Sequence, residues 1–273
     1  MAKSMAKSDA ALRSGKVQSV DRALHLLEIL SEEAEGFRLT DLAVRSGLSR
    51  STVHRLLTTL EMRQFVQFDP TDGLWHVGRK VFQVGSAFAQ QKNFVAPALP
   101  FLRRLRDQTR ETANLGVAVD GRVIFLAQVE SREIMRAITR VGGTTPMINS
   151  GIGKALLSTY SAGEVEAIVA TYGMHKLTPK SLTRPGDLMD DLARIRMQGY
   201  SLDDEEFQQG LRCIAAPVHN QQGEAFCAIS VSGLALRLSP DRVPAVGRLV
   251  VETARALTAT LGGYVPETGA PDR

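Results

Sequence analysis

The sequence predicts an α+β fold in two parts, a small helix-rich N-terminal part and a larger part with an antiparallel sheet flanked by helices. Three observations support this class. Three helical patterns and a strand–turn–strand pattern fill the chain up to residue 78. Two further hairpin signals follow, at Asp120-Gly121 and at Asn220–Gly223. Helices and strands do not alternate regularly enough for a doubly wound parallel sheet.

The composition is that of an ordinary globular chain. Its 273 residues suggest one or two domains, and 44% hydrophobic residues are enough to form cores. The net charge is +4, with the excess concentrated in residues 1–92, which weakly favours an anionic partner. We find no apolar run long enough for a membrane span and no signal-peptide core. Residues 1–16 are expected to form a disordered basic arm and residues 266–273 a loose tail.

Cysteine usage favours a reducing compartment, the cytoplasm. Cys213 and Cys227 are the two cysteines, and neither belongs to a CxxC pair. Thiols and histidines do not cluster in the sequence, so we expect no metal site. No sequence motif indicates a cofactor.

The first three helices follow one another closely. Apolar residues recur at helical spacing over residues 19–33, with Ser19 as the expected N-cap. Thr40 is the expected cap of a short second helix, which Gly47 ends as a left-handed residue. Ser49 is the expected cap of the third helix. Its apolar stripe consists of Val53, Leu56, Leu57 and Leu60.

A hairpin and a connecting helix follow. The strand-like runs FVQF and LWHV flank DPTDG, a strong turn signal. We therefore interpret residues 17–78 as one domain, a winged helix-turn-helix. Residues 79–93 carry a helical apolar pattern, and we interpret them as a linker helix.

The second domain is placed at residues 94–265. It is expected to open with a helix, whose prolines lie at or before its first turns, and to close with a long helix started by Ser239-Pro240. Ser161 and Glu164 form a capping box. The other expected elements are the two hairpins, a strand over residues 134–141, a glycine-rich loop entering a helix at SGIGKALL, and a helix that stops at Gly199.

The start of the third helix indicates contact with double-stranded DNA. A helix-turn-helix places its second helix in the major groove, with its N-terminal residues at base edges. Arginine pairs with guanine there, and serine or threonine contacts bases or phosphates. His76 and Arg79 near the hairpin are further candidates. The predicted DNA contacts are Thr40, Ser49, Arg50, Ser51, Thr52, His54 and Arg55.

Use of this domain for protein contacts is the alternative interpretation. Short polar residues at a helix start can simply be caps. A cap needs one such residue, however, whereas RSTVHR supplies several, two of them cationic. The protein-interaction alternative leaves that charge unexplained.

The chain resembles the IclR family of bacterial transcription regulators from Val17 to Gly263. The stretches VQSVDRALHLLEIL and LTDLAVRSGLSRSTVHRLLTTLEMRQFV resemble the family's opening helix and helix-turn-helix. SGIGKALL, GYSLDDEEFQQGLRCIAAPV and AISVSG resemble its effector-domain signature. Two departures are Ile152, where the family more often has a smaller or polar residue, and Leu234, where proline is common.

The resemblance implies a regulator with a GAF-like effector domain. Such proteins are dimers or dimers of dimers that repress or activate catabolic operons, and they bind a small organic molecule, often a carboxylic acid. Repression relieved by a hydroxy-, oxo- or semialdehyde acid is the expected mode, with an activator of the same architecture as the alternative. The resemblance assigns effector contacts to Gly151, Ile152, Asp203, Cys213, Ser230 and Ser232.

Strand alternation is consistent with that assignment. Phe226, Ala228, Ser230 and Ser232 share one face of AFCAISVSG, and the apolar residues between them share the other. Asp203 is expected in a solvated acidic loop that continues to Glu206, and Lys154 is expected on a solvated helix face. Phe226 with Ile152 would suit a short aliphatic tail.

An enzyme with Cys213 as nucleophile is the competing class. It would need a histidine within hydrogen-bond reach. His219 is expected at the turn beyond its strand, and His175 lies in a polar loop. No GxSxG, Walker or HExxH motif occurs in the sequence. We therefore predict that the protein is not an enzyme.

Overall fold

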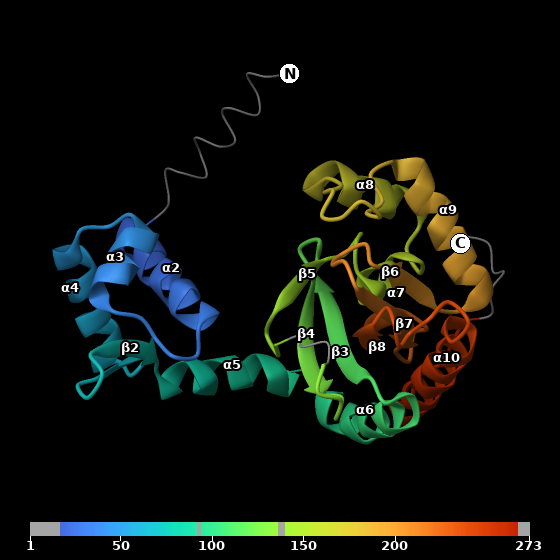
Figure 1. Ribbon diagram of the computed structural model, residues 1–273, viewed down its shortest axis with the longest axis horizontal. Coiled ribbons are helices and arrows are strands. Elements are labelled where there is room, and N and C mark those ends of the chain that lie inside the picture. The colour runs from blue at the N-terminus through green and yellow to red at the C-terminus, as the bar shows by residue number, and fades with distance from the viewer. Residues whose placement is uncertain (1–16, 92–93, 136–139, 267–273) are drawn as a thin grey trace. The chain divides into compact units, whose positions relative to one another are not determined.

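The computed structural model describes residues 17–91, 94–135 and 140–266. The chain forms two compact units that divide between Gln91 and Lys92 (Figure 1). No helix among the described residues is long and apolar enough to cross a membrane.

The N-terminal unit is a winged helix-turn-helix, as predicted. Its core lies between the three helices and the hairpin, around Leu26, Leu42, Val53, Leu57 and Trp75. Gly47 adopts the left-handed conformation (φ 66°) that the tight turn between the second and third helices requires. The elements are α2 (Gln18–Glu32), α3 (Leu39–Ser46), α4 (Arg50–Met62), β1 (Val66–Asp69), β2 (Leu74–Val77) and α5 (Arg79–Gln91).

Two of the predicted helix caps are wrong. The helix α2 begins after Val17 and α3 begins after Arg38, so Ser19 and Thr40 lie inside first turns. Solvent can satisfy the N–H groups of a first turn, so a helix can begin before a good capping residue. The helical apolar pattern predicted over residues 19–33 includes Val20 and Leu24, but both are more than half exposed, so the buried face of α2 is narrower than that pattern.

The C-terminal unit is built on a six-stranded antiparallel sheet with the strand order β5-β4-β3-β8-β7-β6. The two predicted hairpins are confirmed as β3–β4 and β7–β8. The strands are β3 (Thr112–Val119), β4 (Arg122–Val129), β5 (Thr144–Pro146), β6 (Ser201–Asp204), β7 (Leu211–His219) and β8 (Ala225–Leu234).

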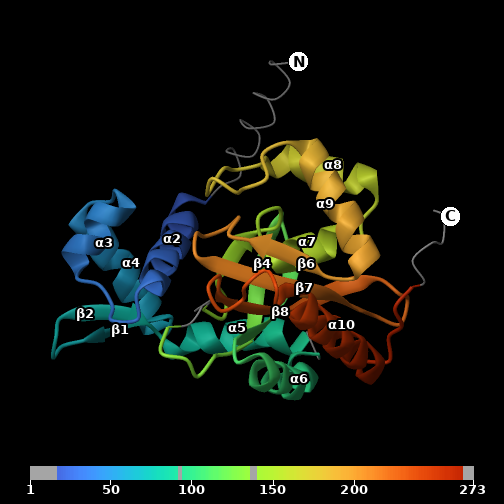
Figure 2. The same ribbon diagram turned by 45° about the vertical axis from the view of Figure 1, so that its right-hand side comes forward.

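Helices cover both faces of this sheet. The pair α6 (Val95–Thr109) and α10 (Val243–Thr260) lies on one face, and α8 (Ala162–Tyr172) and α9 (Pro185–Gln198) lie on the other in both views (Figure 1, Figure 2). The short helix α7 (Gly151–Leu157) packs directly on β7 and β8, on the side of α9.

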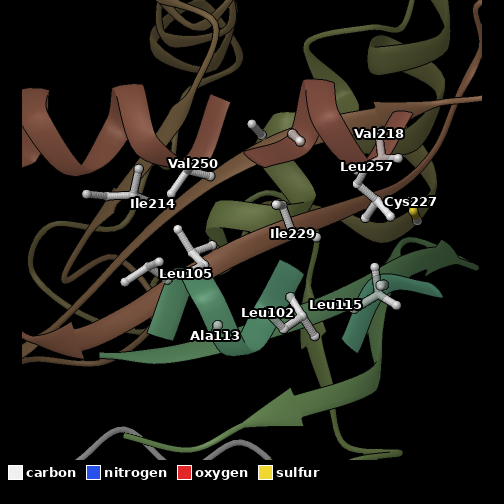
Figure 3. Close-up of a cluster of buried hydrophobic side chains, with 14 of the residues drawn as sticks. Leu102, Leu105, Ala113, Leu115, Ile214, Val218, Cys227, Ile229, Val250 and Leu257 are labelled. Carbon is white, nitrogen blue, oxygen red and sulfur yellow. The ribbon is translucent and has the colours of Figure 1, made fainter. Parts of the chain in front are cut away.

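The larger core fills the space between the sheet and the pair α6 and α10. Ala113 and Leu115 of β3 point into it together with Ile229 of β8 and Leu102 of α6 (Figure 3). Residues alternate across a strand, so Asn114 and the serines of β8 face the opposite side of the sheet. That side holds the smaller core under α7, α8 and α9.

Several predicted boundaries need correction. Two short strands, β5 and β6, were not predicted, and β6 contains Asp203, which was expected in a loop. The helix α10 begins at Val243, after a turn at Ser239, and Pro100 lies inside α6. Of the strand expected over residues 134–141, residues 136–139 lie outside the described residues and the flanking ones are not in a strand.

Candidate functional site

The start of α4 presents a polar, cationic surface. Ser49 caps the helix by accepting a hydrogen bond from the Thr52 N–H (3.2 Å), and its hydroxyl also lies 3.0 Å from that of Ser51. Val53 and Leu57 are fully buried behind this turn, which fixes the helix against its own core. Arg50, His54 and Arg55 are exposed on the outer side.

Thr40, His76 and Arg79, the other candidates for DNA contact, lie outside the start of α4. Thr40 is half-buried in the first turn of α3, where its hydroxyl donates to Asp41 (3.3 Å). The His76 ring packs against the glycine turn at Gly36, where a Cβ atom would stand 2.6 Å from it. Arg79 donates to the Gln64 side chain (3.0 Å) at the base of the hairpin.

The six residues assigned to the effector surround one cavity of the C-terminal unit. Its volume is about 400 Å³, and Gly151, Ile152, Asp203, Cys213, Ser230 and Ser232 all line it. Several other residues line the cavity and carry no local sequence signal, because folding brings them together from distant parts of the chain: Phe125, Arg140, Thr145, Phe207, Gln208 and Leu211.

A row of polar side chains crosses the sheet beside this cavity. Residues paired across neighbouring strands are Gln128 with Asn114, Asn114 with Ser230, Ser232 with Cys213, and Cys213 with Asp203. Asn114 Nδ2 donates to the Ser230 and Ser232 hydroxyls at 3.2 and 3.1 Å. The Ser232 hydroxyl in turn donates to Cys213 Sγ at 3.1 Å.

Asp203 is a buried carboxyl, not a solvated one. It is 1% exposed, and its Oδ1 accepts from the N–H groups of Glu206 (2.8 Å) and Phe207 (3.3 Å). Burial, together with the negative charge of Glu206, raises the pKa of Asp203 to about 7. The expectation of a solvated acidic loop from Asp203 to Glu206 is therefore wrong at both ends, because Glu206 is also buried.

Lys154 is fully buried, which contradicts the expectation of a solvated lysine. Its Nζ donates to Asp191 of α9 (2.8 Å), to the Leu202 carbonyl (2.6 Å) and to Glu206 (2.5 Å). Burial lowers the pKa of Lys154, but the carboxylates of Glu206 and Asp191 outweigh it, and the pKa lies above its ordinary value. Lys154 thus ties α7, at the cavity, to α9 and β6.

Phe226 does not line the cavity. The pairing of β7 with β8 has a bulge between Val218 and His219, which places Phe226 on the same side of the sheet as Cys227, at the larger core. There its ring packs edge-on against that of Phe94, with the ring centroids 4.7 Å apart. The prediction that Phe226 would receive an aliphatic tail of the ligand together with Ile152 is therefore wrong for Phe226, and Phe125 lines the cavity with Ile152 instead.

The surroundings of Cys213 do not activate a nucleophile. Burial, and then the charge of Asp203, raise the pKa of its thiol, whereas a nucleophilic thiolate needs a lowered one. His219 is buried at the end of β7, where its backbone N–H donates to the Thr258 hydroxyl of α10. His175 Nε2 donates to the Tyr172 carbonyl at 3.1 Å. Among the described residues no three His, Cys, Asp or Glu side chains are grouped to hold a metal.

Comparison with known proteins places the chain in a family. The model of the IclR helix-turn-helix domain matches residues 19–70, and that of the bacterial transcriptional regulator IclR C-terminal domain matches residues 86–259. The chain belongs to the IclR family. This agrees with the resemblance in its sequence motifs and with its α+β architecture.

Curated IclR-family relatives are similar over nearly the whole chain. The acetate operon repressor of Salmonella typhimurium is 42% identical over 92% of this chain and 92% of its own. HTH-type transcriptional regulator BhcR of Paracoccus denitrificans is 41% identical over 95% of this chain and 92% of its own. The crystal structure of the Thermotoga maritima IclR has the same fold, with a TM-score of 0.76 and 22% identity over 90% of this chain and 100% of its own.

Membership of the IclR family settles the broad function. The matching families and the curated relatives are transcriptional regulators, several of them repressors, and not enzymes. This IclR-family protein is therefore a DNA-binding transcriptional regulator.

Proposed function

We propose that the protein represses a catabolic operon and leaves its operator when a short organic acid enters the cavity of the C-terminal unit. The observation that carries this proposal is the grouping of six residues from α7, β6, β7 and β8 around one cavity with hydroxyl and carboxyl groups in its wall. A concave site with apolar walls and a few convergent polar groups is typical of small-molecule binding.

The ligand class follows from the chemistry of the wall. The first N–H groups of α7, at Gly151 and Ile152, have no intrahelical partner, and Arg140 also lines the cavity. N–H, hydroxyl and guanidinium groups are donors that suit a carboxylate. The acetate operon repressor is a relative whose name refers to an organic acid, and an IclR homologue from Microbacterium hydrocarbonoxydans was crystallised with 4-hydroxybenzoate.

The DNA contacts belong to the same proposal. Arg50 and Arg55 read base edges or phosphates from the exposed start of α4, and Ser51, Thr52 and His54 contact the backbone there. Ser49 holds that turn, and Thr40 approaches a phosphate from α3. Two copies of the chain, or a pair of such dimers, read a pseudo-palindromic operator.

Substitution of Arg50 tests the placement of the DNA surface. In a gel-shift titration with the operator, Arg50→Ala should weaken binding by about tenfold or more, because one base contact is worth roughly 1–3 kcal/mol. Arg63→Ala is the matched control, since Arg63 is an exposed arginine at the other end of α4. Equal binding by wild type and Arg50→Ala would remove α4 as the recognition helix.

A thermal-shift screen tests the cavity. Short hydroxy and oxo acids should stabilise the wild type, by roughly 2.7 kcal/mol at a hundred times the dissociation constant. The double variant Ser230→Ala/Ser232→Ala should lose the shift. Stabilisation that persists in the double variant would mean that the acid binds elsewhere.

A further inference from the structure

The side chain of Asn114 stands behind the cavity and touches both of its serines. Asn114 lies on β3, is completely buried, and is not itself a lining residue. Its Nδ2 donates one hydrogen to Ser230 Oγ and the other to Ser232 Oγ. An amide nitrogen has two hydrogens and cannot accept, so both serine oxygens act as acceptors toward Asn114.

The Gln128 amide, with its NH₂ toward β3, sets the orientation of the Asn114 amide. Gln128 on β4 is paired with Asn114 across the sheet, and its Nε2 donates to Asn114 Oδ1 at 3.1 Å. If the Asn114 amide were turned by 180°, two NH₂ groups would face each other, so the Gln128 donor holds Nδ2 toward the serines.

The hydroxyl protons must then point away from Asn114. Ser232 gives its proton to Cys213 Sγ. Ser230 lines the cavity at 2% exposure, and no group among the residues that the structure describes takes its proton. A buried hydroxyl proton without an acceptor costs free energy, so Ser230 should donate a hydrogen bond to any acceptor that enters the cavity.

We propose that Asn114 is a positioning residue that sets the direction of the hydrogen bonds in the cavity, so that Ser230 offers its proton to an acceptor-only group of the effector. A carboxylate is such a group, and an amide of the same shape, which carries two hydrogens of its own, is not. This inference rests on the proposed function, because it concerns the same cavity, and it defines the chemical class that the cavity selects.

Two substitutions reverse the direction without changing the shape of the side chain. In Asn114→Asp, a carboxylate oxygen takes the place of Nδ2 and accepts hydrogen bonds from both serine hydroxyls, so their protons point toward residue 114 and away from the cavity. In Gln128→Glu, a carboxylate faces Asn114, so the amide turns its NH₂ toward β4 and its oxygen toward the serines. Gln128 is half-buried and outside the cavity wall, so this variant keeps the test open if Asn114→Asp does not fold. Gln128→Met, which removes the donor without adding an acceptor, is the matched control.

The probes are lactate and its isosteric amide lactamide, with acetate and acetamide as the smallest pair. Binding to the full-length protein is measured at neutral pH by ligand-observed NMR. The wild type should prefer a carboxylate over its amide by about tenfold or more, the difference expected for a hydrogen bond to a charged group. Both reversed variants should lose most of this preference. Gln128→Met, in which no neighbour favours either orientation of the Asn114 amide, should lose only part of it.

A pH series separates the direction of the hydrogen bonds from a loss of structure. When the introduced carboxyl of Gln128→Glu is protonated at lower pH, it can donate to Asn114 again. The carboxylate preference of this variant should therefore recover on acidification relative to that of the wild type. A packing defect would not recover.

Each outcome decides between two statements. If the wild type prefers carboxylates and the reversed variants do so equally, Asn114 does not set the direction, and the proposed effector class stands. A wild type that binds lactamide as tightly as lactate also overturns the inference. If neither lactate nor acetate binds the wild type up to its solubility limit, the proposal of an organic-acid effector is wrong, and the inference that rests on it is wrong as well.

Discussion

At the scale of single residues, the cavity differs from an ordinary protein surface in the burial of its ionisable groups. Lys154 has three N–H donors, and Asp191, Glu206 and the Leu202 carbonyl take all three. None is left for Asp203, which therefore lies near a positive charge without being paired to it. Burial and the negative charge of Glu206 favour the neutral form of Asp203 and raise its pKa, and the charge of Lys154 offsets them only in part.

Asp203 should make the protein less stable as pH rises. Between about pH 4 and pH 7 the folded protein holds a proton that the unfolded chain has released, so the free energy of unfolding falls across this window and stays low above it. The full loss is on the order of 4 kcal/mol. Asp203→Asn should therefore unfold at higher urea concentration than the wild type at pH 8 and at a similar one near pH 4.

Asp204 provides the control with the opposite sign. Partial burial raises its pKa, but Arg212 and Lys180 outweigh this effect, and the net direction is down. Stability from Asp204 is therefore present at neutral pH and is lost as pH falls, so Asp204→Asn should destabilise at pH 8. Similar effects of the two substitutions at pH 8 would contradict the buried, unpaired state of Asp203.

At the scale of elements, α7 is held in the cavity wall by hydrogen bonds at its first turn and by close packing. Ser150 caps it by accepting from the Gly153 N–H, and the Ser201 hydroxyl donates to the Gly151 carbonyl at 2.6 Å. Gly153 allows the close approach of the preceding loop, because a Cβ atom there would stand 2.1 Å from the Met147 oxygen. The glycine-rich start of α7 is therefore a packing requirement as well as a cavity feature.

Alanine substitution at two helical glycines should have opposite effects. Gly153→Ala should abolish soluble folded protein or strongly lower its melting temperature, since backbone atoms cannot move aside cheaply. Gly163 of α8 has open space around its Cβ position, so Gly163→Ala should stabilise by about 0.5–1 kcal/mol. Differential scanning calorimetry measures both, and a stable Gly153→Ala protein would refute the packing argument.

Loss of the buried lysine should be costly. Lys154→Met keeps the length of the side chain but leaves the carboxylates of Asp191 and Glu206 buried without their cation, which should cost about 3–5 kcal/mol. The control is Lys180→Met, which removes a half-exposed lysine that also meets two carboxylates and should cost much less, because solvent screens these ion pairs. Equal losses in urea unfolding would mean that burial does not set the cost.

The predictability of these elements depended on local signals. Asp120-Gly121 and the turn before Ala225 are short-range patterns, and both hairpins followed from them. The strands β5 and β6 have three and four residues and no turn signal, so they could not be predicted. Burial of Lys154 depends on partners 37 to 52 residues away, and the bulge that moves Phe226 is set by pairing with β7.

At the scale of the whole molecule, the chain forms two compact units, and each contains one of the two candidate sites. The polar start of α4 lies in one, and the cavity lies in the other. Under the proposed function, operator binding by the first unit and acid binding by the second share free energy, and this coupling is reciprocal. The helix α5, which ends where the units divide, is the segment that we propose to transmit it.

Reciprocity gives a test that does not require knowledge of the mechanism. If an acid weakens operator binding, the operator should weaken binding of that acid by the same factor, typically about 5–150-fold for a coupling of 1–3 kcal/mol. Fluorescence anisotropy measures the first factor and calorimetry on the protein–operator complex the second. An acid that binds tightly and leaves operator affinity unchanged would separate the cavity from regulation.

The protonated thiol in the cavity has a consequence for the ligands that a sensor can tolerate. Addition of sulfur to an aldehyde proceeds through the thiolate, and the raised pKa of Cys213 keeps that form scarce. Under the proposed function, a semialdehyde acid would therefore add to Cys213 only slowly, and a hemithioacetal that did form would break down again to the thiol and the aldehyde. Occupancy of the cavity would then follow the rise and fall of the metabolite concentration, so that the response remains reversible.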